Sequence, residues 1–156
     1  MIAARIVPSS TFDKILRSQA GLNEYLGFEK EEVSAAAALA SNLYEQGRHA
    51  DARAIFEGLC ALDPGFYLGH AGLGAIDLIE ENPDSALAHL TRAAELNPGD
   101  PSVQANLGEA LLRAGKFADA SRAFERALEL DPAHLDPGAN RARAIIAALK
   151  QATGSR

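Results

Sequence analysis

Apolar residues recur along most of this chain at intervals of three and four positions, the spacing of one face of an α-helix. Three of these segments end in a Leu-(Asp/Asn)-Pro sequence, and their prolines are Pro64, Pro98 and Pro132. The prolines are evenly separated, since 98 − 64 = 34 and 132 − 98 = 34. A fixed period of this size predicts an array of helical repeats in which each unit buries its faces against its neighbours.

Each period divides into two predicted helices joined by a turn, so that three units cover residues 33–66, 67–100 and 101–134. The first unit has one helix that ends near Gly47 and a second helix over residues 50–62, with apolar positions at Leu39, Leu43, Tyr44, Ala52, Phe56 and Leu59. The later units keep this register: Leu73 takes the place of Leu39, and Leu90 takes the place of Phe56. The third unit is the most regular.

The turn of the second unit departs from the pattern, because Glu81 stands where the first unit has Gly47. We expect Asn82 to cap the helix that follows and Pro83 to occupy its first position, where the missing N–H has no consequence. Asp100-Pro101 repeats this combination at the start of the third unit.

Two further helices are predicted outside the repeats. A leading helix within residues 1–32 begins near Thr11 and carries Phe12, Ile15, Leu16 and Leu22; it packs on the first unit or mediates self-association. After Pro132, Asp136-Pro137 opens a helix over about 138–150, within the terminal segment 135–156. Its apolar face should cover the exposed end of the stack, and residues 151–156 should fray. The predicted fold is an all-α superhelix of three helix–turn–helix repeats with a flanking helix at each end.

The composition narrows the function classes. The 156 residues carry a net charge of −6, with a pI near 5.2, which argues against nucleic-acid binding, since that needs a basic stripe. The single cysteine, Cys60, cannot form an internal disulfide, and no apolar run approaches the ~20 residues that span a bilayer. We therefore expect a soluble cytoplasmic protein that does not insert stably into membranes.

The third unit carries the residues of a known repeat family. Leu107-Gly108, Leu111, Ala120, Phe124, Ala127 and Pro132 resemble the tetratricopeptide repeat signature. Small residues at 108 and 120 let the paired helices touch, and large residues at 107, 124 and 130 fill the gaps between them. The resemblance implies a right-handed superhelix in which the first helices of the pairs line a concave groove.

A narrower resemblance lies in the first half of the chain, in Leu43-Tyr44-Glu45-Gln46-Gly47, Phe56-Glu57-Gly58-Leu59-Cys60-Ala61-Leu62-Asp63 and Gly72-Leu73-Gly74-Ala75. These stretches are similar to the type III secretion chaperones that hold translocator proteins. That family also has three repeats, a leading helix and a trailing helix. The resemblance implies a non-catalytic chaperone and, through the leading helix, a possible homodimer. The consensus character of repeats two and three keeps open the alternative of a generic scaffold in a multiprotein assembly.

The repeat frame selects candidate groove residues on the first helix of each unit. They are Ala37, Ser41 and Tyr44 in the first, Leu68, Ala71, Ala75, Leu78 and Ile79 in the second, and Ala105, Glu109, Leu112 and Arg113 in the third. Members of each set share one face of a helix. This mainly apolar trough suits a partner bound as an extended segment with spaced hydrophobic anchors. Alternatively, Leu78, Ile79 and Leu112 are core residues or contact the capping helix, and Tyr44 is a buried core aromatic with its hydroxyl satisfied locally.

Other chemistries have little support. A clamp for a C-terminal carboxylate needs Lys, Arg and Asn donors on the inward face, but only Asn106 and Arg113 are suitable donors there. The four histidines lie in different units without metal-ligand spacing, and Cys60 follows Phe56 by one helical turn, as expected for a buried, inert thiol. We therefore predict no enzyme activity, no metal and no cofactor.

Overall fold

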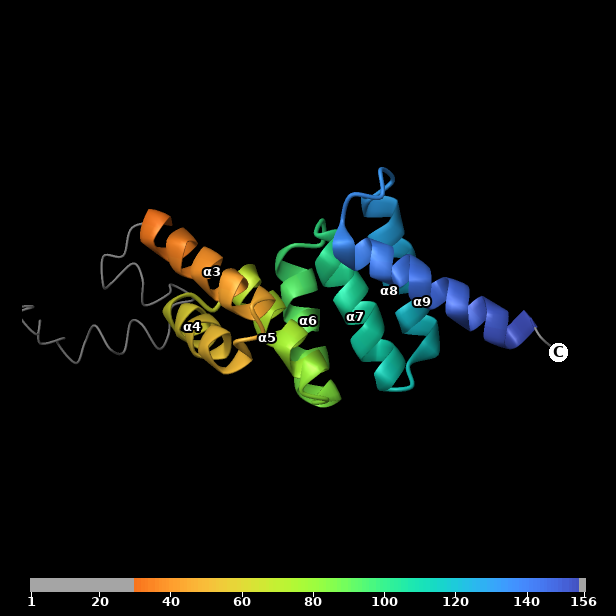
Figure 1. The fold of residues 1–156 in the computed structure, drawn as a ribbon, viewed down its shortest axis with the longest axis horizontal. Coiled ribbons are helices and arrows are strands. Elements are labelled where there is room, and N and C mark those ends of the chain that lie inside the picture. Colours follow the sequence, from red (N-terminus) through yellow and green to blue (C-terminus); the bar gives the residue numbers. More distant parts are fainter. Residues whose placement is uncertain (1–29, 155–156) are drawn as a thin grey trace, which may run out of the picture.

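The computed structural model describes residues 30–154, and these form seven helices. Three pairs follow one another along the chain: α3 (Lys30–Glu45) with α4 (His49–Leu62), α5 (Tyr67–Ile79) with α6 (Pro83–Leu96), and α7 (Pro101–Arg113) with α8 (Phe117–Leu130). The last helix, α9 (Pro137–Gly154), packs on α7 and α8. Figure 1 shows the pairs stacked side by side, with the end of α9 projecting beyond the stack.

The helix boundaries repeat with the period seen in the sequence. The helices α4, α6 and α8 begin at His49, Pro83 and Phe117, so that 83 − 49 = 34 and 117 − 83 = 34. The all-α repeat architecture is therefore confirmed for the described residues. The predicted leading helix lies outside these residues.

Close contact within the pairs depends on a small residue on the first helix. A Cβ atom added to Gly108 would lie 2.5 Å from Cδ1 and 2.6 Å from Cε1 of Phe124, a ring that is almost completely buried. Because no side chain separates them there, α7 and α8 approach until the ring fills the gap, as expected from the sequence.

The turns within the pairs need a left-handed residue. Gly47 and Gly115 adopt φ values of 76° and 73°, and Glu81 adopts 59° at the corresponding place. The second turn is therefore closed by a non-glycine residue in a region that disfavours side chains. The expected compensation is only partly present: Pro83 begins α6, but Asn82 makes no side-chain cap. Asp100 does cap α7, accepting a 3.1 Å hydrogen bond from the N–H of Val103.

The core runs through the whole stack and contains many alanines. Three clusters connect α3, α4 and α5, then α5, α6 and α7, then α7, α8 and α9. Leu73 is buried in the first cluster, whereas Leu39 is 53% exposed. The two residues were expected to be equivalent, but they differ in their degree of burial. Leu73 packs against the preceding pair, but among the described residues nothing precedes α3 to cover Leu39.

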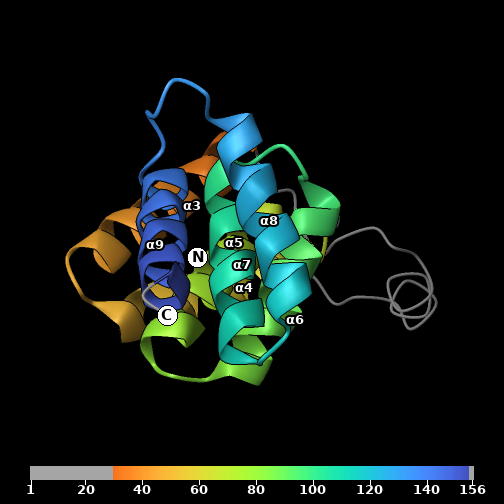
Figure 2. The same ribbon diagram turned by 90° about the vertical axis from the view of Figure 1, so that its right-hand side faces the viewer.

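Three interactions place α9 against α7 and α8. Asp136 caps α9 by accepting from the N–H of Ala139 at 2.7 Å, and it also accepts from the Ser102 hydroxyl of α7 at 2.9 Å. Arg143 donates to Asp131 at the end of α8, over 2.9 Å. In Figure 2, α9 lies on the side of α7 away from α6. The helix runs to Gly154, so the prediction that residues from 151 onward fray is wrong for residues 151–154.

Candidate functional site

Two adjoining cavities lie on the face formed by α3, α5 and α7, and together we call them the groove. The α3–α5 cavity, of about 270 Å³, is lined by Ser41, Tyr44, Glu45, Phe56, Leu68, Ala71, Gly72, Ala75, Asp100, Ser102, Val103 and Asn106. The α7–α9 cavity, of about 300 Å³, is lined by Tyr44, Ala75, Leu78, Ile79, Asn106, Glu109, Arg113 and Arg141. Since Tyr44, Ala75 and Asn106 line both cavities, the groove is continuous.

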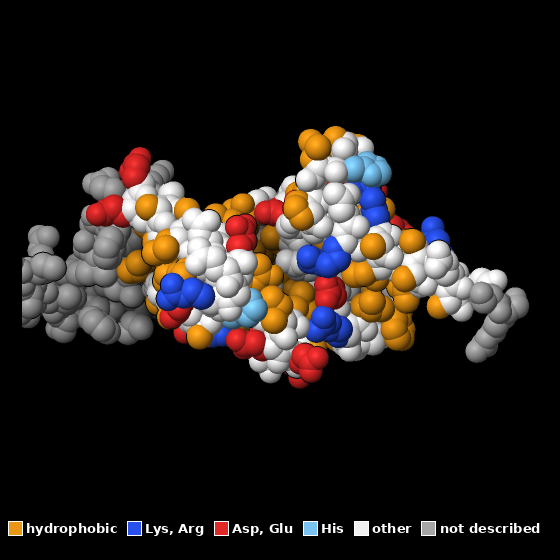
Figure 3. Space-filling view, viewed as in Figure 1, with side chains coloured by type: hydrophobic (Ala, Val, Ile, Leu, Met, Phe, Trp, Pro, Cys, Tyr) orange, Lys and Arg blue, Asp and Glu red, His pale blue; other side chains and the backbone are white. Residues whose placement is uncertain are grey.

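The floor of the groove is apolar because α5 has only small or aliphatic residues on this face. Its exposed residues include Leu68 and Ile79, and the small Ala71, Gly72 and Ala75 lie between them. Figure 3 shows hydrophobic side chains in the hollow between the two ends of the molecule. A trough of this width and polarity can take up spaced apolar side chains of an extended chain.

The position of α5, which forms this floor, is fixed from behind by a buried carboxylate. Asp77 accepts hydrogen bonds of 2.6 Å from both Arg53 of α4 and Ser85 of α6. Hydrogen bonding to Asp77 raises the pKa of Arg53, and the nearby Glu80 acts in the same direction. The network therefore ties the floor helix to the second helices of two repeats.

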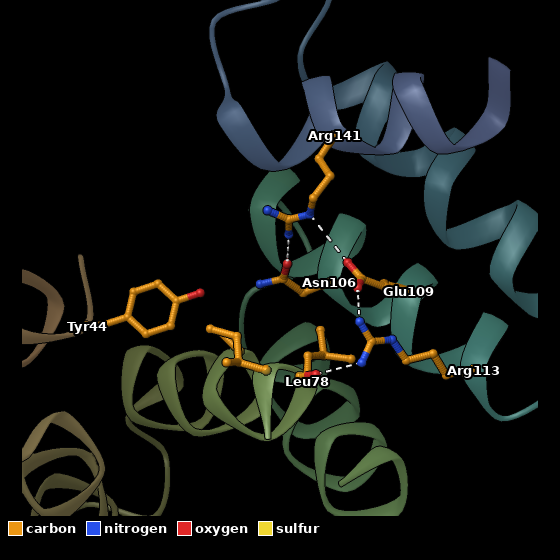
Figure 4. A pocket seen from close by; sticks show the side chains of 8 residues that line it. Tyr44, Leu78, Asn106, Glu109, Arg113 and Arg141 are labelled. Atoms are coloured by element: carbon orange, nitrogen blue, oxygen red, sulfur yellow. Dashed lines mark hydrogen bonds and ion pairs between the residues drawn. The ribbon is translucent and has the colours of Figure 1, made fainter. Parts of the chain in front are cut away.

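The margin formed by α7 and α9 is polar. Glu109 accepts from Arg113 at 2.6 Å and lies 3.3 Å from Nε of Arg141. Arg113 also donates to the carbonyl of Leu78 at 2.6 Å, and Arg141 donates to the side-chain oxygen of Asn106. Figure 4 shows both arginines beside Glu109 and the Tyr44 hydroxyl pointing into the cavity from the opposite wall.

Most of the sequence-predicted positions line one of the two cavities. They are Ser41, Tyr44, Leu68, Ala71, Ala75, Leu78, Ile79, Glu109 and Arg113. Tyr44 is half-buried, with its ring 5.5 Å from that of His49, and so is not a fully enclosed core residue. Leu78 lines the groove but is only 5% exposed, so it also belongs to the core.

Three predicted positions lie elsewhere. Ala37 and Ala105 are buried in the core clusters, and Leu112 lines a separate apolar cavity of about 290 Å³ between α8 and α9. Along α7, Glu109 and Arg113 line the groove, but Asn106 lines it in place of the preceding residue, Ala105. For Leu112, the contact with the capping helix, weighed above as the alternative, is the one observed.

Arg141 is the lining residue outside the three repeats, and sequence reasoning missed it, as it also missed Glu45, Phe56, Asp100 and Val103 within them. It lies on α9, which was expected only to cover the end of the stack. The sequence signal that could have found Arg141 is Asn106, because a side-chain amide that faces a groove is commonly hydrogen-bonded to another polar side chain. The repeat frame gave no signal, because Arg141 corresponds to Leu107 (141 − 34 = 107), which packs in the core.

Among residues 30–154, no group of three or more His, Cys, Asp or Glu residues could hold a metal ion. Burial raises the pKa of the Cys60 thiol to about 11, which makes it a poor nucleophile. His70 and His89 form a pair, with Nδ1 atoms 3.2 Å apart, and burial lowers the pKa of His89. In the part of the chain that is described, no helix is both long and apolar enough to cross a bilayer.

Family models agree with the repeat architecture. Two models described as tetratricopeptide repeat match residues 37–101 and 77–149, which together span most of the chain. The chain belongs to the tetratricopeptide repeat family. This tetratricopeptide fold is a protein-binding fold.

The solved structures that resemble this tetratricopeptide protein include chaperones with bound segments. The Yersinia enterocolitica type III secretion chaperone SycD, in complex with a peptide of the translocator YopD, is 26% identical and has a TM-score of 0.65. That match covers 80% of this chain and 97% of SycD. PcrH, in complex with the chaperone-binding region of PopD, is 27% identical, with a TM-score of 0.68 and coverage of 81% and 97%. The protein thus resembles the translocator chaperones, as the sequence predicted.

One curated protein that is similar in sequence is much longer than this chain. Superkiller protein 3 of Schizosaccharomyces pombe is 38% identical over 58 residues. The match covers 37% of this chain but only 4% of that protein, so the likeness is confined to a short stretch of a much longer molecule.

Proposed function

We propose that this tetratricopeptide protein is a cytoplasmic chaperone that holds an extended hydrophobic segment of a secreted translocator-type partner in its groove. The apolar floor on α5 carries the proposal. Leu68 and Ile79 expose aliphatic surface in a concave site, and burying that surface against apolar anchors of a partner is favourable. The likeness to SycD with a bound peptide of the translocator YopD, and to PcrH with the bound chaperone-binding region of PopD, supports this partner class.

A membrane-inserting protein needs a chaperone before export, because its exposed apolar segments aggregate in water. Binding in the groove would cover these segments without any chemical step. The partner would be the product of a neighbouring reading frame that encodes hydrophobic membrane-inserting segments. The cytoplasm is the compartment in which such a complex would form.

The test is co-expression of the full chain with that partner, followed by co-purification and an assay of partner solubility. Ile79→Glu is the informative variant, because Ile79 is 49% exposed and the substitution should leave the fold intact. Leu78→Glu is less suitable because it would bury a charge. Leu135→Glu, on an exposed loop outside the groove, is the matched control. We expect Ile79→Glu to abolish co-purification while Leu135→Glu retains it; equal binding by both folded variants would refute the proposal.

A scaffold in a multiprotein assembly is the second candidate, favoured by the consensus character of repeats two and three and by the match of 58 residues to Superkiller protein 3. A scaffold would hold two different proteins at once on separate surfaces. Pull-downs from the source cell with the wild type and Ile79→Glu distinguish the two functions. A scaffold would retain partners in the variant, whereas a groove chaperone would lose its one class of partner.

Self-association through the leading helix is a further proposal, and the helix lies outside the described residues. Deletion of residues 1–27 followed by light scattering tests it. A dimer that becomes monomeric supports the proposal, and an unchanged mass removes the helix as a self-association element.

A further inference from the structure

The arginines on the α7–α9 margin outnumber the carboxylate that they share. Arg113 and Arg141 both contact Glu109, which leaves one positive charge in excess at this end of the groove. The Glu109 side chain is 18% exposed, while those of Arg113 and Arg141 are 40% and 49% exposed. The acidic group is therefore largely covered, and the surface offered to a ligand is cationic even though the whole chain carries −6.

Arg141 also has an N–H donor group that makes no hydrogen bond to the described residues. Arg141 uses Nε toward Glu109 and Nη2 toward Asn106, so within the described residues its Nη1 has no bond. Across the cavity, the Tyr44 hydroxyl has no hydrogen-bond partner in the same part of the chain. Planar guanidinium donors beside a hydroxyl can bind a carboxylate through charge-assisted hydrogen bonds.

These cationic side chains are held in place before any ligand arrives. Arg113 is fixed at both ends of its fork, by Leu78 of α5 and by Glu109 of its own helix. Arg141 reaches from α9 to Asn106 and Glu109 on α7. Because these side chains have already lost rotamer freedom in the fold, a ligand that meets them incurs little further entropic penalty.

We propose that the α7–α9 cavity binds the carboxylate of an aspartate or glutamate side chain in the partner segment. The proposal rests on the proposed function, because the apolar neighbours of that residue would lie on the α5 floor. Packed helices lie about 8–10 Å apart, a distance that an extended chain crosses in about three residues. Since alternate side chains share a face, the acidic residue should stand two or four positions from an apolar anchor.

A side chain, and not the C-terminus of the partner, is the occupant that the first repeat favours. On α3, Ala37 is buried and Ser41 donates its hydroxyl to the carbonyl of Ala37 at 3.0 Å. The α3 wall therefore supplies a tyrosine hydroxyl but no cation to complete a clamp around a chain end. The positive charge that attracts a carboxylate lies only at the α7–α9 margin. Because the groove is continuous there, a partner segment can pass through it and offer an acidic side chain instead of its C-terminus.

The test begins with a random-peptide display library, selected on the full chain and on Arg141→Gln. We expect the wild type to enrich peptides with apolar anchors and an acidic residue at a constant spacing, and the variant to enrich the anchors alone. Enrichment of apolar peptides without an acidic preference would overturn this inference but leave the proposed function standing. A selection that enriches no apolar peptide would count against both.

Selected peptides are then synthesised as Glu and Gln pairs, with blocked termini, and their dissociation constants are measured by fluorescence anisotropy. We expect the Gln peptide to bind the wild type about tenfold more weakly, as for a lost charge-assisted hydrogen bond, and both peptides to bind Arg141→Gln alike. Arg113→Gln is the second variant, and Arg126→Gln, on α8 and paired with Glu129, is the matched control. Restoration of tight binding by a free C-terminus on the Gln peptide would show that the site recognises a chain end and would refute the side-chain assignment.

Discussion

A single methyl group, added at two different helical glycines, tests whether contact between α7 and α8 positions the third repeat. At Gly58 of α4 an added Cβ has no neighbour within 4 Å, whereas at Gly108 of α7 it would lie 2.5 Å from the Phe124 ring. Both changes replace glycine within a helix, so both gain about 0.5–1 kcal/mol from reduced backbone freedom. The two variants therefore differ only in their surroundings.

The packing term decides the sign at Gly108. Phe124 is almost completely buried and its ring is rigid, so it cannot move away from the new methyl group without displacing a helix. Overpacking of this kind costs about 1–3 kcal/mol. Gly58→Ala should therefore raise the free energy of unfolding by about 0.5–1 kcal/mol, and Gly108→Ala should lower it by about 1 kcal/mol.

Urea denaturation followed by far-ultraviolet circular dichroism measures both free energies. Unchanged slopes against urea concentration would show that the folded states remain equally compact. Equal stabilisation by the two alanines would refute the reasoning, because it would mean that the helix pair does not need the close approach at Gly108. Gly108→Ala should also shift Asn106 and Glu109 and thereby weaken peptide binding.

Three further outcomes are expected. Asp77→Ala should lower the free energy of unfolding by about 3 kcal/mol in urea, since it removes the acceptor of Ser85 and leaves Arg53 with only the more exposed Glu80, while Glu80→Gln should change it by less than about 0.5 kcal/mol. Burial lowers the pKa of His89 in the folded state, so the contribution of the neutral imidazole to stability is complete above the unfolded pKa near 6.5 and is lost as the pH falls through the lower folded pKa. Thermal melts from pH 7.5 to 5 should show this decline in stability, and His89→Gln should make the pH dependence flatter. The Cys60 thiol, with its pKa raised to about 11 from 9.0, should react with iodoacetamide about 100-fold more slowly at pH 8 than in urea; equal rates would contradict its burial.

The repeat fold could be predicted because its signals are local and recur. Each Leu-(Asp/Asn)-Pro sequence marks the end of a helix, and the 34-residue interval places the next helix without any knowledge of tertiary contacts. Gly108 and Phe124 could be paired in the same way, as small and large partners at fixed places in the frame. The left-handed conformation of Glu81 was not predicted, because the sequence showed only that this turn lacks glycine, whereas its backbone conformation matches that of Gly47 and Gly115.

The groove was harder to predict because it depends on helix rotation. A rotation of about 100°, one residue along a helix, separates Ala105 in the core from Asn106 on the groove wall. Arg141 could not be found from the period at all. It reaches the groove because Asp136 and Arg143 hold α9 against α7 and α8, in a position that the repeat frame does not describe.

The contribution of α9 to the groove sets a limit on how this array could grow. Repeat proteins commonly gain or lose whole units, because each unit contacts only its neighbours. Inserting a fourth pair between α8 and α9 would preserve every internal contact of the first three pairs. The insertion would nevertheless separate Arg141 from Asn106 and Glu109, so that the two arginines would no longer lie together at the α7–α9 margin. Duplication of a unit at this place would therefore remove the proposed carboxylate site.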